Sequence, residues 1–299
     1  MELRPYQNEA NDRIQEEWAS GVKKTLLVLP TGLGKTVTFS DLTKQLVSKG
    51  ERVLIMAHRG ELLDQAADKL FKVTGLKSAV EKADQTAKNS FYSVTVGSVQ
   101  TLMREKRLQD FPQDYYDTII VDEAHHILAS SYQKVLEYFS EAKVLGVTAT
   151  ADRTDKKNLG EFFESLAYEY TLPDAIKNKY LSPMKAMTIP LKIDLSGVSM
   201  SAGDFKASEV GSALDPYLYQ IADEMVKNCS NRKTVVFLPL VATSKKFRDI
   251  LNEKGFKAAE VNGDSKGVNG SKGQNVNSNG CSGHVDSRTK WDRNRIGIW

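Results

Sequence analysis

The sequence predicts an α/β protein built on a doubly wound parallel sheet. Between Thr25 and Thr150, apolar runs of strand length alternate with stretches of helical periodicity, which is the pattern of a parallel sheet covered by helices on both faces. A glycine-bearing turn follows the first apolar run, and a later run ends in two adjacent carboxylates, Asp122 and Glu123. Because ligands bind at the carboxyl ends of parallel strands, these features predict a site at that edge of the sheet.

The predicted elements of the first domain follow this alternation in order. Strands are expected at residues 25–29, 53–57, 94–96, 118–121 and 144–147. A helix is expected after the first strand because apolar residues recur there at helical spacing: Val37, Phe39, Leu42, Leu46 and Val47. The domain, placed at residues 1–195, is expected to be closed or extended by three further segments: 162–170, a helix near 173–179 and an alternating run over 184–195.

Residues 30–36 read Pro-Thr-Gly-Leu-Gly-Lys-Thr and lie between the first strand and the first helix, the context that a phosphate-binding loop requires. The glycines let backbone N–H groups point inward at phosphate oxygens, and the helix dipole adds positive charge. Lys35 is expected to reach the β and γ phosphates, and Thr36 to offer its hydroxyl to Mg²⁺. The alternative is an ordinary strand-to-helix loop, which the specific Gly-x-Gly-Lys-Thr pattern disfavours. The predicted nucleotide-binding residues of this loop are Thr31, Gly32, Leu33, Gly34, Lys35 and Thr36.

Asp122 and Glu123 are predicted to complete a nucleotide-hydrolysis site. They follow a β-branched run, 118–121, that is typical of a buried parallel strand. A carboxylate pair at such a place is costly unless it serves a function. Asp122 is expected to hold Mg²⁺, usually through water, and Glu123 to position and deprotonate the attacking water.

Three segments in order resemble motifs I, II and III of superfamily 2 helicases of the DEAD/DEAH-box type. They are residues 30–36, Asp-Glu-Ala-His at 122–125 and Thr-Ala-Thr at 148–150. The resemblance implies a RecA-like, P-loop NTPase fold. It implies catalytic roles for four residues: Lys35, Asp122, Glu123 and His125. It also implies that His125, Thr148 and Thr150 couple the nucleotide to the nucleic-acid side.

Leu3-Arg4-Pro5-Tyr6-Gln7 looks like the adenine-reading segment that precedes the phosphate loop in this superfamily. The resemblance implies that Gln7 pairs with the adenine edge and that Arg4 or Tyr6 lies against the ring. The same residues also fit a helix N-terminus with Pro5 in its first turn. Both interpretations can hold at once.

Two further strand ends are similar to motifs Ia and Ib and therefore imply nucleic-acid contact. The first carries His58 and Arg59, and the second carries Ser98 and Gln100. A helix N-terminus with such side chains beside it can hold a phosphate of a single strand without reading its sequence. The alternative at each position is a capped helix that faces solvent.

Adjacent His125 and His126 raise the alternative of a transition-metal site. Zinc motifs need a second set of His, Cys or carboxylate ligands at a characteristic spacing, and the sequence offers none beside these histidines. The expected cofactors are therefore ATP and Mg²⁺ alone.

Composition limits the class of protein and its mode of binding. The chain has 299 residues, 40% hydrophobic and 26% charged, which is enough for about two ordinary globular domains. Its net charge of only +3 excludes binding of nucleic acid by bulk charge, so contacts would be few, local and salt-sensitive. Two cysteines make no disulfide framework, and the N-terminus lacks an apolar signal region. A cytoplasmic protein without a transmembrane segment is expected.

A second α/β unit is predicted after a small, polar linker or loop at 196–213. Its expected elements are a helix at 215–228, a strand at 234–238, a helix at 241–254 and a strand at 258–261. The strand at 234–238 and the helix after it resemble motif IV. We therefore expect a partial second RecA-like domain over residues 214–264.

Residues 265–299 are expected to form no further part of that domain. They contain no Leu, Ala, Phe, Tyr, Met, Glu or Pro, and no apolar periodicity survives there. Nothing in the segment resembles motif V or VI. Two interpretations stay open, a natural disordered tail and a shifted reading frame near Lys266, and the abrupt change of composition favours the second.

The resemblance covers about residues 1–264 and implies an ATP-dependent helicase or translocase. The expected partner is DNA, or less expectedly RNA, bound mainly through the phosphate backbone. The alternative is a nucleotide-dependent nucleic-acid-binding module without productive unwinding, because motifs V and VI are missing. A P-loop kinase is disfavoured, since Asp-Glu-Ala-His at 122–125 would have no role in one.

Overall fold

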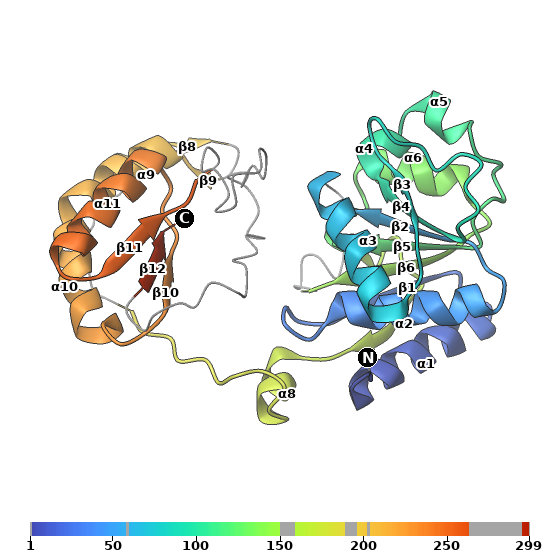
Figure 1. Ribbon diagram of the computed structural model, residues 1–299, viewed down its shortest axis with the longest axis horizontal. Coiled ribbons are helices and arrows are strands. Elements are labelled where there is room, and N and C mark those ends of the chain that lie inside the picture. The colour runs from blue at the N-terminus through green and yellow to red at the C-terminus, as the bar shows by residue number, and fades with distance from the viewer. Residues whose placement is uncertain are drawn as a thin grey trace. The chain divides into compact units, whose positions relative to one another are not determined.

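The computed structural model of the protein describes residues 2–57, 60–149, 159–188, 196–201, 204–262 and 295–298. The chain divides into two compact units, Met1–Met184 and Lys185–Trp299 (Figure 1). The first unit contains every residue predicted to bind or hydrolyse the nucleotide.

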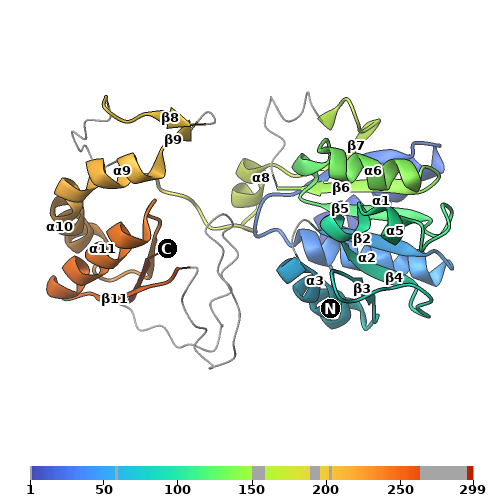
Figure 2. The same ribbon diagram turned by 90° about the horizontal axis from the view of Figure 1, so that it is seen from above.

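The first unit contains a seven-stranded sheet of order β3-β4-β2-β5-β6-β1-β7. Figure 1 labels the strands from β3 to β1 in this order, and Figure 2 labels the edge strand β7. All of its strand pairs are parallel, so the predicted doubly wound parallel sheet is confirmed. Its strands are β1 Lys24–Val28, β2 Val53–Ala57, β3 Ala79–Glu81, β4 Val94–Ser98, β5 Thr118–Asp122, β6 Lys143–Thr148 and β7 Ser165–Glu169.

Helices cover both faces of this sheet because its central strands are apolar on both sides. Ile55 and Ile120 point into one buried cluster, which contains residues of α1, α2 and α3. Met56 and Val121, their neighbours along the strands, point into the other, which contains residues of α4, α5 and α6. The helices and helical turns of the unit are α1 Pro5–Ala19, α2 Lys35–Ser48, α3 Gly60–Thr74, α4 Val99–Leu102, α5 Glu105–Leu108, η1 Ala124–His126, α6 Ser130–Tyr138 and α8 Leu172–Lys177.

The segment 162–170, whose structure the sequence left open, supplies the edge strand of this sheet. Its strand β7 pairs in parallel with β1, with a shift of register between Leu26 and Leu27. The predicted helix near 173–179 is α8, which is shorter. Residues 182–188 form no helix or strand, and the rest of the alternating run, 189–195, lies outside the described residues.

Gly146, in the middle of β6, is predicted to tolerate no side chain. A Cβ atom built on it would lie 2.2 Å from Cζ of Phe163 and less than 3 Å from two further ring atoms, and the Phe163 ring is itself buried. Overpacking of this kind costs about 1–3 kcal/mol. For a domain of this size we expect Gly146→Ala to lower the melting temperature by about 2–12 °C, measured by thermal unfolding.

Gly197→Ala is the control for that experiment, because a Cβ on Gly197 would meet no atom within 4 Å. It should leave the melting temperature nearly unchanged. Equal melting temperatures for both variants would show that Phe163 moves aside without cost.

The second unit contains a three-stranded parallel sheet of order β10-β12-β11. Helices α10 and α11 pack on it around a separate apolar cluster, in which Leu218, Phe247 and Leu251 are fully buried. This architecture follows the predicted order of helix, strand, helix and strand. The elements of the unit are β8 Met200–Ser201, β9 Asp204–Phe205, α9 Ala207–Leu214, η2 Asp215–Tyr217, α10 Leu218–Cys229, β10 Thr234–Val236, α11 Val241–Glu253, β11 Lys257–Glu260 and β12 Arg295–Ile298.

Two sequence-based predictions about this unit are wrong. The expected linker 196–213 contains a β8–β9 hairpin and most of helix α9. Small residues suggested a loop, whereas Gly211 allows close packing: a Cβ on it would lie 2.3 Å from Cδ1 of Leu240. The segment 265–299 was expected to add no strand, yet β12 pairs with both β10 and β11. The four residues of β12 are too few to show an apolar periodicity. They form a strand because they pair with β10 and β11, which are distant in the sequence.

No helix in the described part of the chain has the length and apolar character needed to cross a membrane.

Candidate nucleotide site

The loop between β1 and α2, the predicted phosphate loop, passes through two left-handed glycines into the start of a helix. Gly32 and Gly34 both have left-handed φ angles, 92° and 79°, which residues with a Cβ adopt only at a cost. The N–H of Leu33 donates to the carbonyl of Pro30 at 3.1 Å, and the N–H of Thr38 donates to the carbonyl of Gly34 at 3.0 Å. Gly34 is the N-cap of α2, so the positive end of the helix dipole lies at the loop. Lys35 and Thr36 begin the helix, as the sequence predicted.

The start of α1 holds this loop in place. The Tyr6 hydroxyl donates to the Leu33 carbonyl at 2.8 Å, and Nε2 of Gln7 donates to the same oxygen at 3.0 Å. Oε1 of Gln7 accepts the N–H of Arg4 at 2.9 Å. A Cβ on Gly34 would lie 2.8 Å from Nε2 of Gln7, so the contact also requires a glycine. Gln7 is thus a support of the phosphate loop, and its contact with adenine stays a prediction.

The strand order brings the predicted carboxylates to the same edge as the loop. β6 lies between β1 and β5, with Thr148 opposite Val28 and Asp122 opposite Val147. Neighbouring strands are about 4.8 Å apart. The end of β1, where the loop begins, and the end of β5, where Asp122 lies, are therefore two strand spacings apart. Thr148 ends the strand between them, and its carbonyl accepts the N–H of Leu29 at 3.0 Å. Thr150 lies outside the described residues.

Asp122 has an electrostatic environment that suits a cation. Burial raises the pKa of its carboxyl, and the charge of Glu123 raises it further. The N–H of Glu123, which donates to Oδ1 at 3.0 Å, lowers the pKa, as do the charges of Lys35 and Lys69. A divalent cation would offset the unfavourable burial of this carboxylate, so Asp122 fits the predicted role in Mg²⁺ binding.

Glu123 leaves the strand in an unusual backbone conformation. Its φ and ψ are 54° and 55°, a left-handed conformation that is strained for a residue with a Cβ and that recurs at functional sites. Its side chain is 45% exposed, and Oε2 lies 3.5 Å from Nδ1 of His125. The carboxylate is thus accessible, with one histidine beside it. The rings of His125 and His126 lie 4.1 Å apart, and no three metal-ligating side chains converge among the described residues.

Two of the predicted nucleic-acid residues, Ser98 and Gln100, lie at another strand end of the same edge. Ser98 ends β4 and donates its hydroxyl to Oε1 of Gln100 at 2.7 Å. Ser98 is buried, whereas Gln100 is exposed. β4 is separated from β5 by β2, so these residues are offset from Asp122 along the edge. His58 and Arg59 lie outside the described residues.

Two tyrosines that no sequence pattern predicted pack against the segment 3–7. Tyr170 and Tyr180 lie around Tyr6, with ring centroids 5.0 and 4.7 Å from that of Tyr6. Arg4 lies over the Tyr180 ring at 5.5 Å. About 165 to 175 positions separate these partners in the chain, and no local pattern in the sequence links them.

Comparison with known proteins identifies the family. Residues 1–153 match the family described as "Type III restriction enzyme, res subunit", and the chain belongs to this family, among the superfamily 2 helicases. It is 30% identical over 290 residues to the "Putative ATP-dependent helicase IRC3" of Saccharomyces cerevisiae, a match that covers 89% of this chain and 41% of that protein. The chain thus spans less than half the length of this relative.

Solved structures share the fold. A fragment of a "putative HsdR subunit of a type I restriction enzyme" from Vibrio vulnificus has a TM-score of 0.63 and 23% identity, over 87% of this chain and 48% of that chain. The "ATP-dependent Type ISP restriction-modification enzyme LlaBIII bound to DNA" also has a TM-score of 0.63, with 15% identity over 87% of this chain and 22% of that chain. These likenesses confirm the RecA-like fold.

Proposed function

We propose that this chain is the ATP-hydrolysing part of a helicase or translocase that acts on DNA. One observation carries the proposal: the loop at 30–36, Thr148 and the pair Asp122 and Glu123 stand at the carboxyl ends of the adjacent strands β1, β6 and β5. Residues 1–195 would form the ATP-binding domain, and residues 214–264 would belong to a second RecA-like domain. A cytoplasmic location completes the proposal.

The phosphate end of ATP would bind at the loop. Backbone N–H groups of Thr31, Gly32 and Gly34 and the N-terminus of α2 would surround the phosphate oxygens, and Lys35 would neutralise the β and γ phosphates. Thr36 and Asp122 would hold Mg²⁺, which supplies charge neutralisation at the phosphates when bound. Arg4 and Gln7 would face the adenine, since both lie at the start of α1 beside the loop.

Glu123 would act as the general base toward the attacking water. Its carboxylate is exposed to solvent and carries no resolved salt bridge to Lys or Arg among the described residues, and His125 beside it can hold its orientation. A base must reach the water whose proton it takes, and the Glu123 side chain, at the carboxyl end of β5, is 45% exposed. His125, Thr148 and Thr150 would then report the state of the nucleotide to the nucleic-acid side.

DNA is favoured over RNA by the relatives. The matching family is described as a restriction-enzyme subunit, and one structure of the same fold is bound to DNA. Contacts would run through the phosphate backbone to the strand ends that carry His58, Arg59, Ser98 and Gln100, with affinity that falls as salt rises because counterions are released.

Phosphate release with and without nucleic acid tests this function. We expect single- or double-stranded DNA to raise ATP turnover more than RNA of the same length does, and the stimulation to weaken as salt increases. Lys35→Ala is the control for turnover by contaminating ATPases. ATP binding without phosphate release in the presence of each nucleic acid would contradict the proposed hydrolysis.

A further inference from the structure

The segment from Tyr170 to Leu181, which we name the α8 strap, runs from the end of β1 back to the phosphate loop. Its first residue is fixed to the sheet because the N–H of Tyr170 donates to the carbonyl of Val28 at 3.0 Å, immediately before the loop begins. Thr171 is the N-cap of α8 and accepts the N–H of Asp174. Figure 1 shows α8 beside the N-terminal end of α1.

A tight turn at the end of α8 sends the chain back toward the nucleotide site. Lys179 has a left-handed φ of 60°, and the N–H groups of Tyr180 and Leu181 both donate to the carbonyl of Ala175, at 2.9 and 3.0 Å. Ala175 is fully buried, so the turn is anchored in the core. The two residues after the turn therefore have defined positions.

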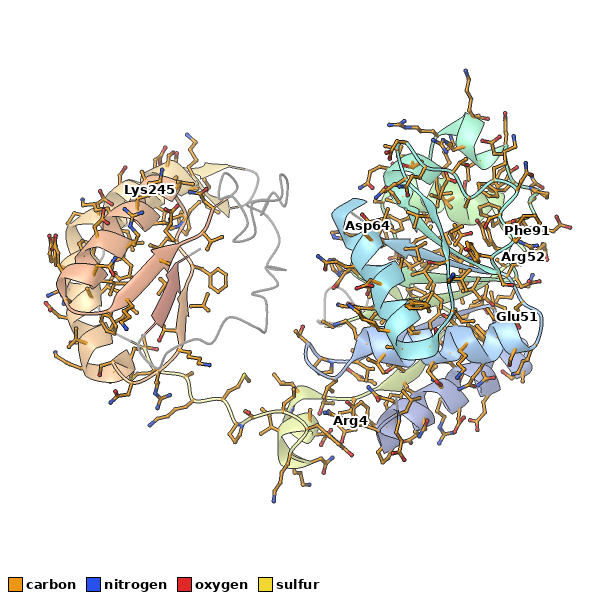
Figure 3. The ribbon with its side chains drawn as sticks, viewed as in Figure 1. Arg4, Glu51, Arg52, Asp64, Phe91 and Lys245 are labelled. Atoms are coloured by element: carbon orange, nitrogen blue, oxygen red, sulfur yellow. The ribbon has the colours of Figure 1, made fainter. Side chains whose placement is uncertain are left out.

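Tyr180 contacts the residues proposed to face adenine. Its ring meets Tyr6 edge-on, at 4.7 Å between centroids and 66° between planes. The guanidinium of Arg4 lies over the same ring at 5.5 Å, and Figure 3 shows Arg4 on the side of α1 that faces α8. Aromatic pairs and cation–π contacts both restrict the partner to a narrow range of positions. Tyr180 thus restricts the position of Arg4, the residue proposed to face the adenine.

Leu181 contacts the phosphate loop itself. A Cβ on Gly32 would lie 3.0 Å from Cδ2 of Leu181, so the leucine lies directly against the first glycine of the loop. Gly32 has a φ of 92°, a conformation that needs support from its surroundings to persist. The strap is therefore attached to the loop at both sides, through Val28 before it and through Gly32 within it.

We propose that Tyr180 and Leu181 are positioning residues for the nucleotide, with Tyr180 acting on the base end through Arg4 and Leu181 acting on the phosphate end through Gly32. The proposal rests on the proposed function, since it assigns the two ends of ATP to these neighbours. It adds residues that lie about 150 positions beyond the phosphate loop.

Binding of ATP and of inorganic tripolyphosphate to the full chain, measured by calorimetry, separates the two roles. Tyr180→Ala should weaken ATP binding about tenfold. It should weaken tripolyphosphate binding by a much smaller factor, because that ligand has no base and is affected by Tyr180 only through Tyr6 and the Leu33 carbonyl. Leu181→Ala should weaken both ligands by the same factor. Tyr180→Phe should bind ATP like the wild type, since the ring and not the hydroxyl makes these contacts.

Tyr92→Ala is the matched control, because Tyr92 is a partly exposed tyrosine in the loop before β4, at the other end of the strands. It should bind both ligands normally. Equal loss of ATP and tripolyphosphate in Tyr180→Ala, or loss in Tyr180→Phe, would overturn the role of Tyr180, and wild-type binding in Leu181→Ala would overturn that of Leu181. If Lys35→Ala also binds ATP normally, the proposed function fails as well; if only the strap variants bind normally, the function stands and the strap proposal falls.

Discussion

Lys35→Ala is expected to weaken ATP binding about 10- to 150-fold, the loss of one hydrogen-bonded interaction between charged groups. Lys35 is the sole basic residue of the segment 30–36, and it begins α2 directly after Gly34. Its side chain is half-buried and belongs to no apolar cluster of the unit. The fold should therefore survive, with an unchanged melting temperature in the absence of nucleotide.

Lys44→Ala provides the matched control for this experiment, because Lys44 is an exposed lysine on the same helix. Both variants lose one positive charge, and only Lys35→Ala should lose affinity for ATP in calorimetric titration. The Lys35 charge also lowers the pKa of Asp122, so its removal should raise that pKa and make Mg²⁺-dependent binding weaker at acidic pH. Equal ATP affinities in the two lysine variants would remove the phosphate loop from the nucleotide site.

The strands and the phosphate loop were predictable because their signals are local. Apolar runs of strand length mark β2, β5 and β6, and the glycines at 32 and 34 mark the turn before α2. The position of Asp122 at the sheet edge followed from one rule, that parallel strands gather ligands at their carboxyl ends. Each of these inferences needs only a few consecutive residues.

Contacts between distant segments were not predictable from such patterns. Gln7 was assigned to adenine from its segment alone, whereas its hydrogen bond to Leu33 depends on how α1 lies against the loop. Tyr180 and Leu181 reach the site through the turn at Lys179, and a left-handed lysine carries no sequence signal. In the second unit, β12 forms between β10 and β11, and α9 is stabilised by packing of Gly211 against Leu240. These contacts and elements depend on tertiary packing, which local sequence propensity does not encode.

Glu123→Gln is expected to lower ATP turnover by about 10² to 10⁴ while ATP and Mg²⁺ still bind. Glutamine keeps the size of the side chain, and its amide cannot take a proton from water. The backbone N–H of residue 123, which donates to Asp122, is untouched by the change. The charge of Glu123 is one of the causes that raise the pKa of Asp122, so its loss should lower that pKa and leave Asp122 more fully ionised.

Glu123→Gln tests the role of this carboxylate because it is expected to change the rate of hydrolysis and not the affinity for ATP. ATP affinity, measured at several Mg²⁺ concentrations, should be equal to or greater than that of the wild type, because a more fully ionised Asp122 binds a cation better. Single-turnover phosphate release should carry the whole loss. Glu137→Gln, at an exposed glutamate of α6, removes the same charge away from the site and should turn over ATP normally. Suppose that Glu123→Gln instead loses ATP binding and hydrolyses the ATP that it does bind at the normal rate. Glu123 would then be a ligand or a structural group and not the base. The base would have to be one of the other groups near Asp122, and His125 would be the first residue to substitute.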